Sequence, residues 1–212
     1  MKNGVQLIKD KLLAVAVLAE DMVDRAVHAL LEGSDAMARQ VREDDDQLDR
    51  LEQEVDELAV DLLAPGAETQ DLRAITVGLK ISNDLERIGD EAGTIAKRVL
   101  ALNHREGWEP PLKEEITAMG ERACALLREC VDSYVANDAG KARQLIPQDD
   151  EVDLLNRAYQ KKIVEMMQAD PAGIPGYLEL GEIVKRLERI ADHAINIAEV
   201  VIFIEAAAPR CE

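Results

Sequence analysis

Aromatic side chains are scarce in this sequence of 212 residues: Phe, Trp and Tyr make up 2% of it, although apolar residues make up 47%. The apolar content comes from Leu, Ile, Val and Ala, and that mixture favours helices over sheets. No apolar run approaches the ~18 residues that a transmembrane helix needs. We therefore expect an all-α protein without a membrane-spanning segment.

Cysteine is scarce too. Cys124, Cys130 and Cys211 lack a CxxC spacing, and an odd number of cysteines cannot pair completely within one chain. They indicate a reducing compartment and argue against a disulfide framework or a zinc knuckle. The first lysines of the chain, placed ahead of an apolar stretch, faintly resemble a signal peptide, but the same stretch fits a helical stripe that recurs later. We predict a cytoplasmic protein.

Basic residues are outnumbered: 25 Lys and Arg face 43 Asp and Glu, which gives a formal net charge of −18. Such a chain repels phosphate backbones and anionic lipid headgroups. Nucleic acid is therefore excluded as an expected partner. Metal cations and basic protein surfaces are the partners that this charge favours.

The most informative feature that is present is an internal repeat. The hexapeptide LERIGD at Leu85–Asp90 returns as LERIAD at Leu187–Asp192. The apolar positions around it recur at the same offset, with alternating spacings of three and four residues that place them along one stripe of a helix. An upstream segment with two aspartates, Asp45 and Asp49, also recurs, at Asp149 and Asp153. The pattern predicts a tandem duplication of a helical unit.

Glycine and proline divide the chain into six predicted helices, with breaks at 33–34, 65–66, 103–111, 137–138 and 170–176. Ser34 and Asp138 suit helix N-caps. Short connections make consecutive helices antiparallel. The result is two tandem up-down-up three-helix bundles, residues 1–104 and 105–212, with Trp108 of the joint expected to pack on an inter-bundle surface. The predicted helices span 5–31, 35–63, 70–102, 111–136, 139–168 and 175–206.

Acidic residues follow the same repeat. On the predicted second helix, Asp45, Asp49, Glu52 and Asp56 form a ribbon beside the apolar stripe, and the second copy retains Asp149 and Asp153 but has Asn156 in place of Glu52. Glu86 and Asp90 lie one turn apart on the third helix, on a face that reaches water, and their counterparts are Glu188 and Asp192.

Two interpretations of these carboxylates are open. Paired acids at i and i+4 are hard oxygen ligands that can bridge Mg²⁺, Ca²⁺, Mn²⁺ or iron. The same spacing is also typical of a solvated acidic face, in which Arg87 and Arg189 pair with nearby acids. Gly89 and Ala191, at matching positions, permit close helix packing or access of an ion to the acids. His193, which replaces Glu91 of the first copy, is expected to be an exposed helix residue.

With these motifs the chain resembles the PhoU family of phosphate-uptake regulators. The resemblance is carried by LERIGD with Ile95 and Ala96, by LERIAD with Ile197 and Ala198, and by the two aspartate pairs, and it runs over nearly the whole chain. It implies two three-helix bundles, as the periodicity does. It also implies a negative regulator of the phosphate-starvation response that joins a phosphate ABC transporter, through its ATPase subunit, to a membrane sensor histidine kinase, as a homodimer peripheral to the membrane complexes.

Some members of the family carry iron or other metal clusters on E/DxxxD motifs. The resemblance thus implies metal ions, of iron, zinc, manganese or magnesium, on eight ligands: Asp45, Asp49, Glu86 and Asp90 in the first copy, and Asp149, Asp153, Glu188 and Asp192 in the second. The two copies depart from each other at Glu52 against Asn156 and at Glu91 against His193, so the two sites are expected to differ in metal number or affinity.

Two other functions are alternatives to this regulator. A metal-free helical adaptor, serving this or another transporter, would use its acidic faces on basic partner surfaces. A carboxylate-metal enzyme is the less favoured alternative, because the ExxH motif of di-iron oxidases is missing: Gly89 and Ala191 stand where its histidine would. A GxxxxGK[ST] loop is missing as well. We expect a protein that is not an enzyme.

Overall fold

The computed structural model describes residues 2–63, 69–107 and 109–206, and every regular element among them is a helix. The all-α prediction is therefore confirmed. No helix in the described ranges is long and apolar enough to cross a membrane. Trp108, Cys211 and the predicted break at Pro65 and Gly66 lie outside the described residues. The elements are α1 (Lys2–Glu32), α2 (Asp35–Leu62), α3 (Thr69–Asn103), α4 (Lys113–Ala136), α5 (Ala139–Leu145), η1 (Ile146–Gln148), α6 (Asp149–Ala169), η2 (Pro171–Gly173) and α7 (Ile174–Ala206).

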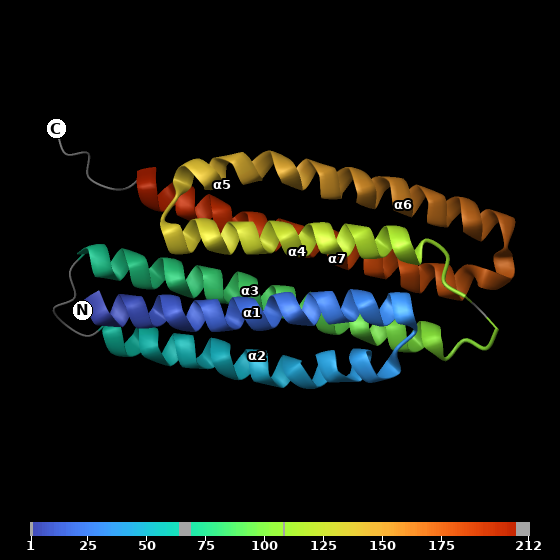
Figure 1. Ribbon diagram of the computed structural model, residues 1–212, viewed down its shortest axis with the longest axis horizontal. Coiled ribbons are helices and arrows are strands. Elements are labelled where there is room, and N and C mark those ends of the chain that lie inside the picture. The colour runs from blue at the N-terminus through green and yellow to red at the C-terminus, as the bar shows by residue number, and fades with distance from the viewer. Residues whose placement is uncertain (1, 64–68, 108, 207–212) are drawn as a thin grey trace.

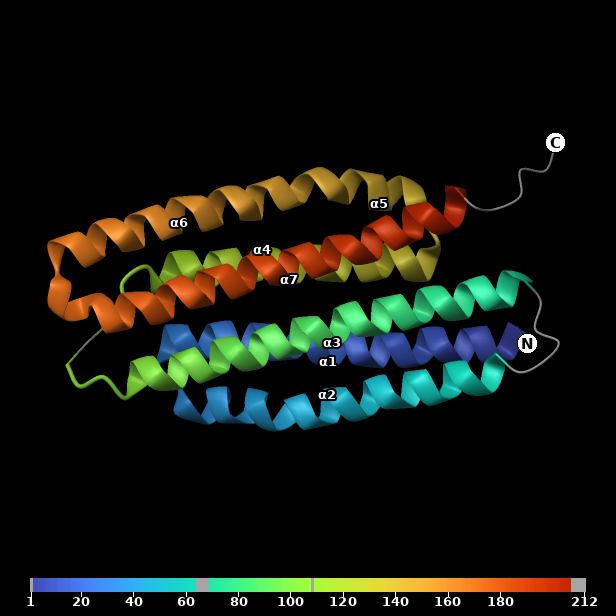
Figure 2. The ribbon, with the colours of Figure 1, turned by 180° about the vertical axis from the view of Figure 1, so that it is seen from behind.

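The helices form two bundles that lie side by side along one long axis. Helices α1, α2 and α3 pack on one another, and α4, α5, α6 and α7 make the second group (Figure 1). Seen from behind, α3 lies against α7 along the seam between the groups (Figure 2), and α1 packs on α4. One continuous cluster of buried apolar side chains runs through both groups. The division at residues 104 and 105 into two domains stays a proposal.

The predicted fifth helix is wrong in one respect. Residues 139–168 were expected to form a single helix, but the structure has α5, a 3-10 turn at Ile146–Gln148 and then α6. Pro147 explains the interruption, because proline has no amide hydrogen to donate and its ring clashes with the preceding turn of an α-helix. Helices α5 and α6 still follow one another as one curved rod in Figure 1.

Both predicted N-caps are present. Ser34 Oγ accepts a hydrogen bond from Met37 N at 3.4 Å, and Asp138 Oδ1 accepts one from Lys141 N at 2.8 Å. Each cap satisfies one of the free amides of a first helical turn, an arrangement that stabilises a helix by about 0.5–2 kcal/mol. Gly33 before the first cap has φ +67°, a left-handed conformation that glycine adopts without strain.

One pair of facing positions has side chains of different size in the two halves. A Cβ added at Gly89 of α3 would overlap Cδ2 of Leu48, which is fully buried on α2. At the equivalent positions of the second half the sequence has Ala191 and Val152, both also fully buried. The larger residue on α7 is thus matched by a smaller one on α6, which supports close packing as the role of this position.

Replacing Gly89 with Ala should lower the free energy of unfolding by about 1–2 kcal/mol. Overpacking of a core costs about 1–3 kcal/mol, and the better helix propensity of alanine returns about 0.5–1 kcal/mol. Adding Leu48→Val makes the pair resemble that of the second half and should restore most of the loss. Urea unfolding of the two single variants and the double variant measures this coupling. Additive losses in the double variant would contradict it.

The seam between α3 and α7 contains polar contacts as well as apolar ones. Asp84 of α3 accepts a hydrogen bond from Asn196 Nδ2 at 3.0 Å, and its Oδ1 lies 3.0 Å from Nδ1 of His193. His193 was expected to be exposed, and this expectation is wrong: its side chain is 19% exposed. The helix face that carries His193 is covered because α3 packs on it.

Glu91 of α3 makes the second polar contact of the seam. Within the described ranges it is the one charged residue that is buried, with 4% of its surface exposed. Its carboxylate lies 3.1 Å from Nη1 of Arg186 and 2.8 Å from Nη1 of Arg189, both on α7. Arg189 was predicted to pair with acids of its own solvated face, and this is wrong: its partner is a buried acid of the other half of the chain.

The two seam contacts occupy equivalent positions with reversed charge. In the repeat, Asp84 corresponds to Arg186 and Glu91 corresponds to His193. One contact therefore joins an acid of α3 to a histidine of α7, and the other joins arginines of α7 to an acid of α3. If both halves carried the residues of one of them, each contact would join like charges: Asp and Glu from the first half, or Arg and His from the second.

Candidate metal centre

Three aspartates of the second half converge between α6 and α7. Asp149 and Asp153 stand one turn apart on α6, and Asp192 faces them from α7. One carboxylate oxygen from each lies within 4.8 Å of the others. Among the described residues, these form the group of acidic, histidine or cysteine ligands that comes this close. We call Asp149, Asp153, Glu188 and Asp192 the second cluster.

Crowding and burial shape the charge of the second cluster. Burial, followed by the negative charges of Asp192 and Asp153, raises the pKa of Asp149 from its ordinary value of 3.8 to about 6. Burial and then the neighbouring aspartates also raise the pKa of Glu188 and of Asp192. Carboxyl groups whose ionised form is disfavoured in this way are stabilised in that form by a bound cation.

Two oxygens at the second cluster have no hydrogen-bond partner among the described residues. Oδ1 of Asp149 is buried without a donor, and so is Oδ1 of Asn156 one turn beyond Asp153. A buried oxygen without a donor costs about 1–3 kcal/mol. A cation bound at the Asp149 oxygen would remove that cost there.

The first half holds the equivalent acids, Asp45 and Asp49 on α2 with Glu86 and Asp90 on α3, which we call the first cluster. Burial and then the charge of Asp90 raise the pKa of Asp45, and burial and Asp90 raise that of Glu86. The predicted exposure of the pair on α3 agrees with the structure, where the side chains of Glu86 and Asp90 are 23% and 45% exposed. Glu52 lies close enough to act on the charge of Glu86.

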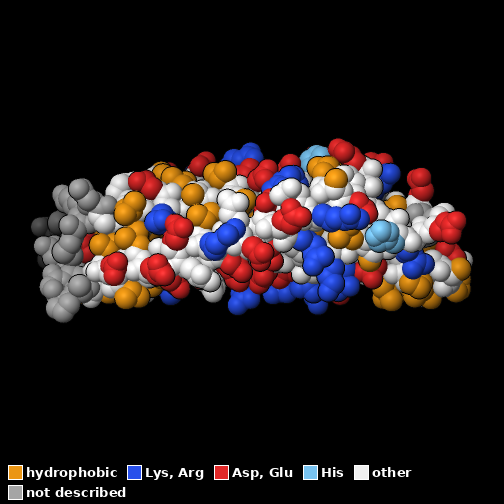
Figure 3. Space-filling view, turned by 90° about the horizontal axis from the view of Figure 1, so that it is seen from below, with side chains coloured by type: hydrophobic (Ala, Val, Ile, Leu, Met, Phe, Trp, Pro, Cys, Tyr) orange, Lys and Arg blue, Asp and Glu red, His pale blue; other side chains and the backbone are white. Residues whose placement is uncertain are grey.

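A guanidinium, half exposed, pairs with the two α3 acids of the first cluster. Arg87 Nε lies 3.5 Å from Glu86, and Arg87 Nη1 lies 3.2 Å from Asp90. The predicted pairing of Arg87 with nearby acids is confirmed. Figure 3, which looks onto the α2 side, shows acidic side chains along the surface with lysine and arginine side chains gathered near its middle. This face is therefore of mixed charge.

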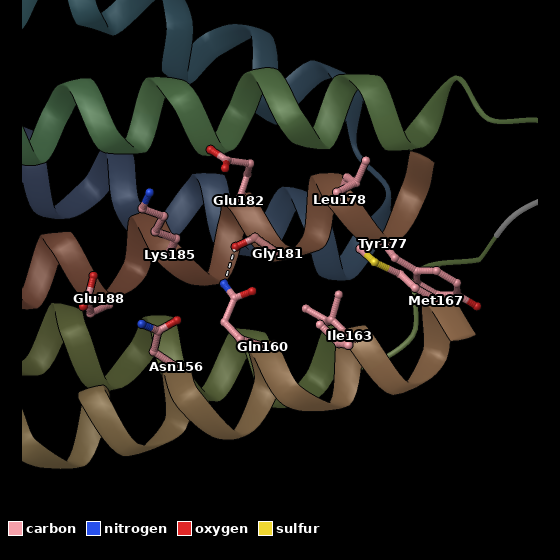
Figure 4. Close-up of a pocket in the computed structure, with 11 residues that line it drawn as sticks. Asn156, Gln160, Ile163, Met167, Tyr177, Leu178, Gly181, Glu182, Lys185 and Glu188 are labelled. Atoms are coloured by element: carbon pink, nitrogen blue, oxygen red, sulfur yellow. Dashed lines mark hydrogen bonds between the residues drawn. The ribbon is translucent and has the colours of Figure 1, made fainter. Parts of the chain in front are cut away.

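An open groove between α6 and α7 ends at the second cluster. It has a volume of about 500 Å³, with Asn156 and Glu188 at one end and Tyr177 and Met167 at the other (Figure 4). Gln160 crosses the groove and donates a hydrogen bond to the carbonyl oxygen of Gly181 at 2.8 Å. Glu188, one of the predicted ligands of the second half, thus lines a solvent-accessible path.

Sequence reasoning did not identify Glu91 as a buried residue. It also did not identify Asp84 as the acid of the other polar contact in the seam. A glutamate on the polar side of a helix is usually exposed, so its position alone gave no signal. The signal was the reversal of charge between equivalent positions of the two copies. A residue that changes sign after duplication points to a contact between the copies.

Sequence comparisons agree with the repeat. The family profile described as PhoU domain matches residues 12–99 and 116–201, which fall within α1–α3 and α4–α7. The chain is 38% identical over 200 residues to the phosphate-specific transport system accessory protein PhoU homolog of Pseudomonas aeruginosa, covering 93% of this chain and 81% of that protein. It is 28% identical over 205 residues to the homolog of the same description from Clostridium acetobutylicum, covering 96% and 93%.

Solved structures show the same arrangement of helices. The crystal structure of PhoU from Pseudomonas aeruginosa superposes with a TM-score of 0.92 at 35% identity, covering 98% of this chain and 99% of that one. The phosphate transport system regulatory protein PhoU from Streptococcus pneumoniae superposes with a TM-score of 0.88 at 25% identity, covering 95% and 94%. The descriptions of the two homologs and of the Streptococcus pneumoniae structure name an accessory or regulatory protein of phosphate transport.

Proposed function

The chain belongs to the PhoU family, and from this we propose that it is an accessory protein of a phosphate-specific transport system that restrains phosphate uptake and the phosphate-starvation response. The observation that carries the proposal is likeness over both halves, in sequence and in structure. The partners are the ATPase subunit of a phosphate ABC transporter and a sensor histidine kinase, and the protein acts from the cytoplasm as a homodimer.

A binding function suits the surface of the molecule. Large apolar side chains are exposed at several places, among them Val17 at 67%, Leu154 at 61% and Phe203 at 60%. Exposed apolar positions among acidic ones suit contact with proteins that have basic surfaces. Such association is weakened by salt, because screening shortens the reach of exposed charges. The protein holds kinase and transporter in the repressed state by contact.

Metal ions are part of this proposal. Carboxylate oxygens are the donors that iron, zinc, manganese and magnesium accept, and the partnerless buried oxygen of Asp149 fits such an ion. When bound, the ions supply positive charge that neutralises the acids and fastens neighbouring helices. The ligands are Asp45, Asp49, Glu86 and Asp90 of the first cluster and Asp149, Asp153, Glu188 and Asp192 of the second.

One observation favours a second candidate, the metal-free adaptor. Arg87 already pairs with Glu86 and Asp90 of the first cluster, so part of the acidic surface is balanced by the chain itself. An adaptor of this kind would bind the transporter and the kinase equally well in the presence and absence of a strong chelator. A regulator that needs its ions would lose that binding with the chelator.

Deletion of the gene should derepress phosphate-scavenging activity in cells grown in rich phosphate, because the contact that holds the kinase in its repressed state is lost. The measurement is secreted phosphatase activity in high and low phosphate. The parent gene supplied from a plasmid should restore repression. Equal activity in the deleted and parent strains would overturn the proposed function.

The contribution of the ions is tested in the same strain. A plasmid that encodes Asp149→Ala with Asp192→Ala should fail to restore full repression. The matched control is Glu57→Ala with Asp61→Ala, which removes the same charge from an exposed part of α2. Full repression by the first variant would leave the regulator but exclude an ion at the second cluster from its mechanism.

A further inference from the structure

Arg87 and Arg189 are equivalent residues with different partners. Each directly follows the glutamate of its hexapeptide, so each is in the right place to neutralise the acids of its own cluster. Arg87 does so, with contacts to Glu86 and Asp90. Arg189 instead reaches across the seam to Glu91, at 2.8 Å. The two copies therefore differ in whether this arginine pairs with the acids of its own cluster.

Glu91 has the properties needed to hold an arginine. It is 4% exposed, and both of its oxygens are used, Oε1 by Arg189 and Oε2 by Arg186. Arg189 is 40% exposed, but its partner carboxylate is buried, and a pair with a buried member is screened less than one wholly at the surface. A released Arg189 would find the acids of its own helix one turn away, as Arg87 does.

The first half has no such residue. The position equivalent to Glu91 carries His193, which is engaged with Asp84 and is not an acid. Nothing in the seam therefore draws Arg87 away from the first cluster. In the second half, by contrast, no ion pair joins Glu188 or Asp192 to a lysine or arginine in the part of the chain that the structure describes.

Arg189 and His193 act on Asp192 as nearby charges that lower its pKa, without an ion pair to it. Two further basic residues lie near the second cluster, and neither fills it. Arg157 lies 2.8 Å from Oδ2 of Asp153, but it is 72% exposed and uses one oxygen of that carboxylate. Lys185 acts on Glu188 only as a nearby charge. The space between Asp149, Asp153 and Asp192 stays open, with their oxygens within 4.8 Å and one Asp149 oxygen buried without a donor.

We propose that Glu91 is a positioning residue that keeps the second cluster open for a divalent cation by holding Arg189 across the seam, whereas Arg87 takes the place of a cation in the first cluster. This inference rests on the proposed metal binding and adds that the two clusters differ in affinity for the cation. The second cluster is the high-affinity site, and the first cluster binds a cation only when Arg87 is displaced.

Titration calorimetry with Mn²⁺ on the chelator-treated full-length protein tests the proposal. The parent should show a tight binding step that Asp149→Ala with Asp192→Ala removes. Glu91→Gln should weaken this step by about tenfold or more, since a guanidinium ~6 Å from a divalent ion costs about one power of ten in affinity even at the dielectric constant of water. The matched control is Glu182→Gln, which removes a carboxylate that contacts Arg186 but not Arg189 and should leave the step unchanged.

The decisive variant combines Glu91→Gln with Arg189→Gln. If Glu91 acts by holding Arg189, removal of the released arginine should restore tight binding, whereas general damage to the seam would not be repaired. Arg87→Gln should independently strengthen binding at the first cluster, and this variant leaves the seam intact. Unchanged Mn²⁺ affinity in Glu91→Gln, or no restoration in the double variant, would overturn the inference but leave metal binding standing. A parent that binds no Mn²⁺ would overturn both.

Discussion

A chain with Arg186→Asp and His193→Glu should lose about 3 kcal/mol of unfolding free energy. These changes give α7 the residues that α3 has at the equivalent positions, so that Glu91 and Asp84 would each face a second carboxylate across a seam that is largely shielded from water. Breaking a buried ion pair costs about 3–5 kcal/mol, and partial exposure of these side chains places the loss at the lower end. Urea unfolding in the presence of a chelator, followed by circular dichroism, measures it.

The reciprocal exchange provides the control. Adding Asp84→Arg and Glu91→His to the same chain restores opposite charges in both contacts with their direction reversed. This chain should recover most of the lost stability, although Arg189 stays without its acidic partner. If the four-residue variant were no more stable than the two-residue variant, the charge pattern of the seam would not be what joins the halves.

Bound cations should have the second large effect. A divalent ion at one hundred times its dissociation constant raises the free energy of unfolding by about 2.7 kcal/mol. We expect protein purified without chelator to retain iron, zinc or manganese, and a chelator to lower its melting temperature. Elemental analysis and thermal unfolding of the parent and of Asp149→Ala with Asp192→Ala measure both effects. The same loss of melting temperature in parent and variant would contradict the assignment of the ligands.

The cation effect should also depend on pH. Asp149 binds its proton more tightly in the folded protein than in the unfolded chain, because burial and Asp192 raise its pKa to about 6. Protonation therefore stabilises the metal-free fold below the ordinary pKa of 3.8, and this contribution is lost as the pH rises through 6. Mn²⁺ needs the ionised carboxylate, so its stabilising effect should grow over the same range. The Glu57→Ala and Asp61→Ala variant should follow the parent.

The helical architecture could be predicted because its signals are local. Apolar stripes gave the helices, and Ser34 and Asp138 gave two of their starts, which the structure confirms. The prediction ran through Pro147 because the residues on both sides favour a helix. A proline in an otherwise helical segment opposes that tendency, and here it replaces one turn of α-helix with a 3-10 turn.

The candidate site could be predicted only as pairs of acids on helix faces. Spacing placed Asp149 near Asp153 and Glu188 near Asp192, but it could not give the distance between α6 and α7, which depends on how the side chains between the two helices pack. It also treated the two clusters as near copies. Their difference arises from Glu91, a residue of the other half, and contacts between halves leave no mark on helical periodicity.

The buried apolar cluster that continues from one bundle into the other has a consequence for how the molecule loses its structure. Neither group of helices has a core that ends at the seam, since α3 and α7 share theirs. Opening one half would expose apolar surface of the other, so the two should melt together in one cooperative transition. A protein with two copies of one helical unit should thus unfold as a single unit, and a substitution that destabilises either copy should destabilise both.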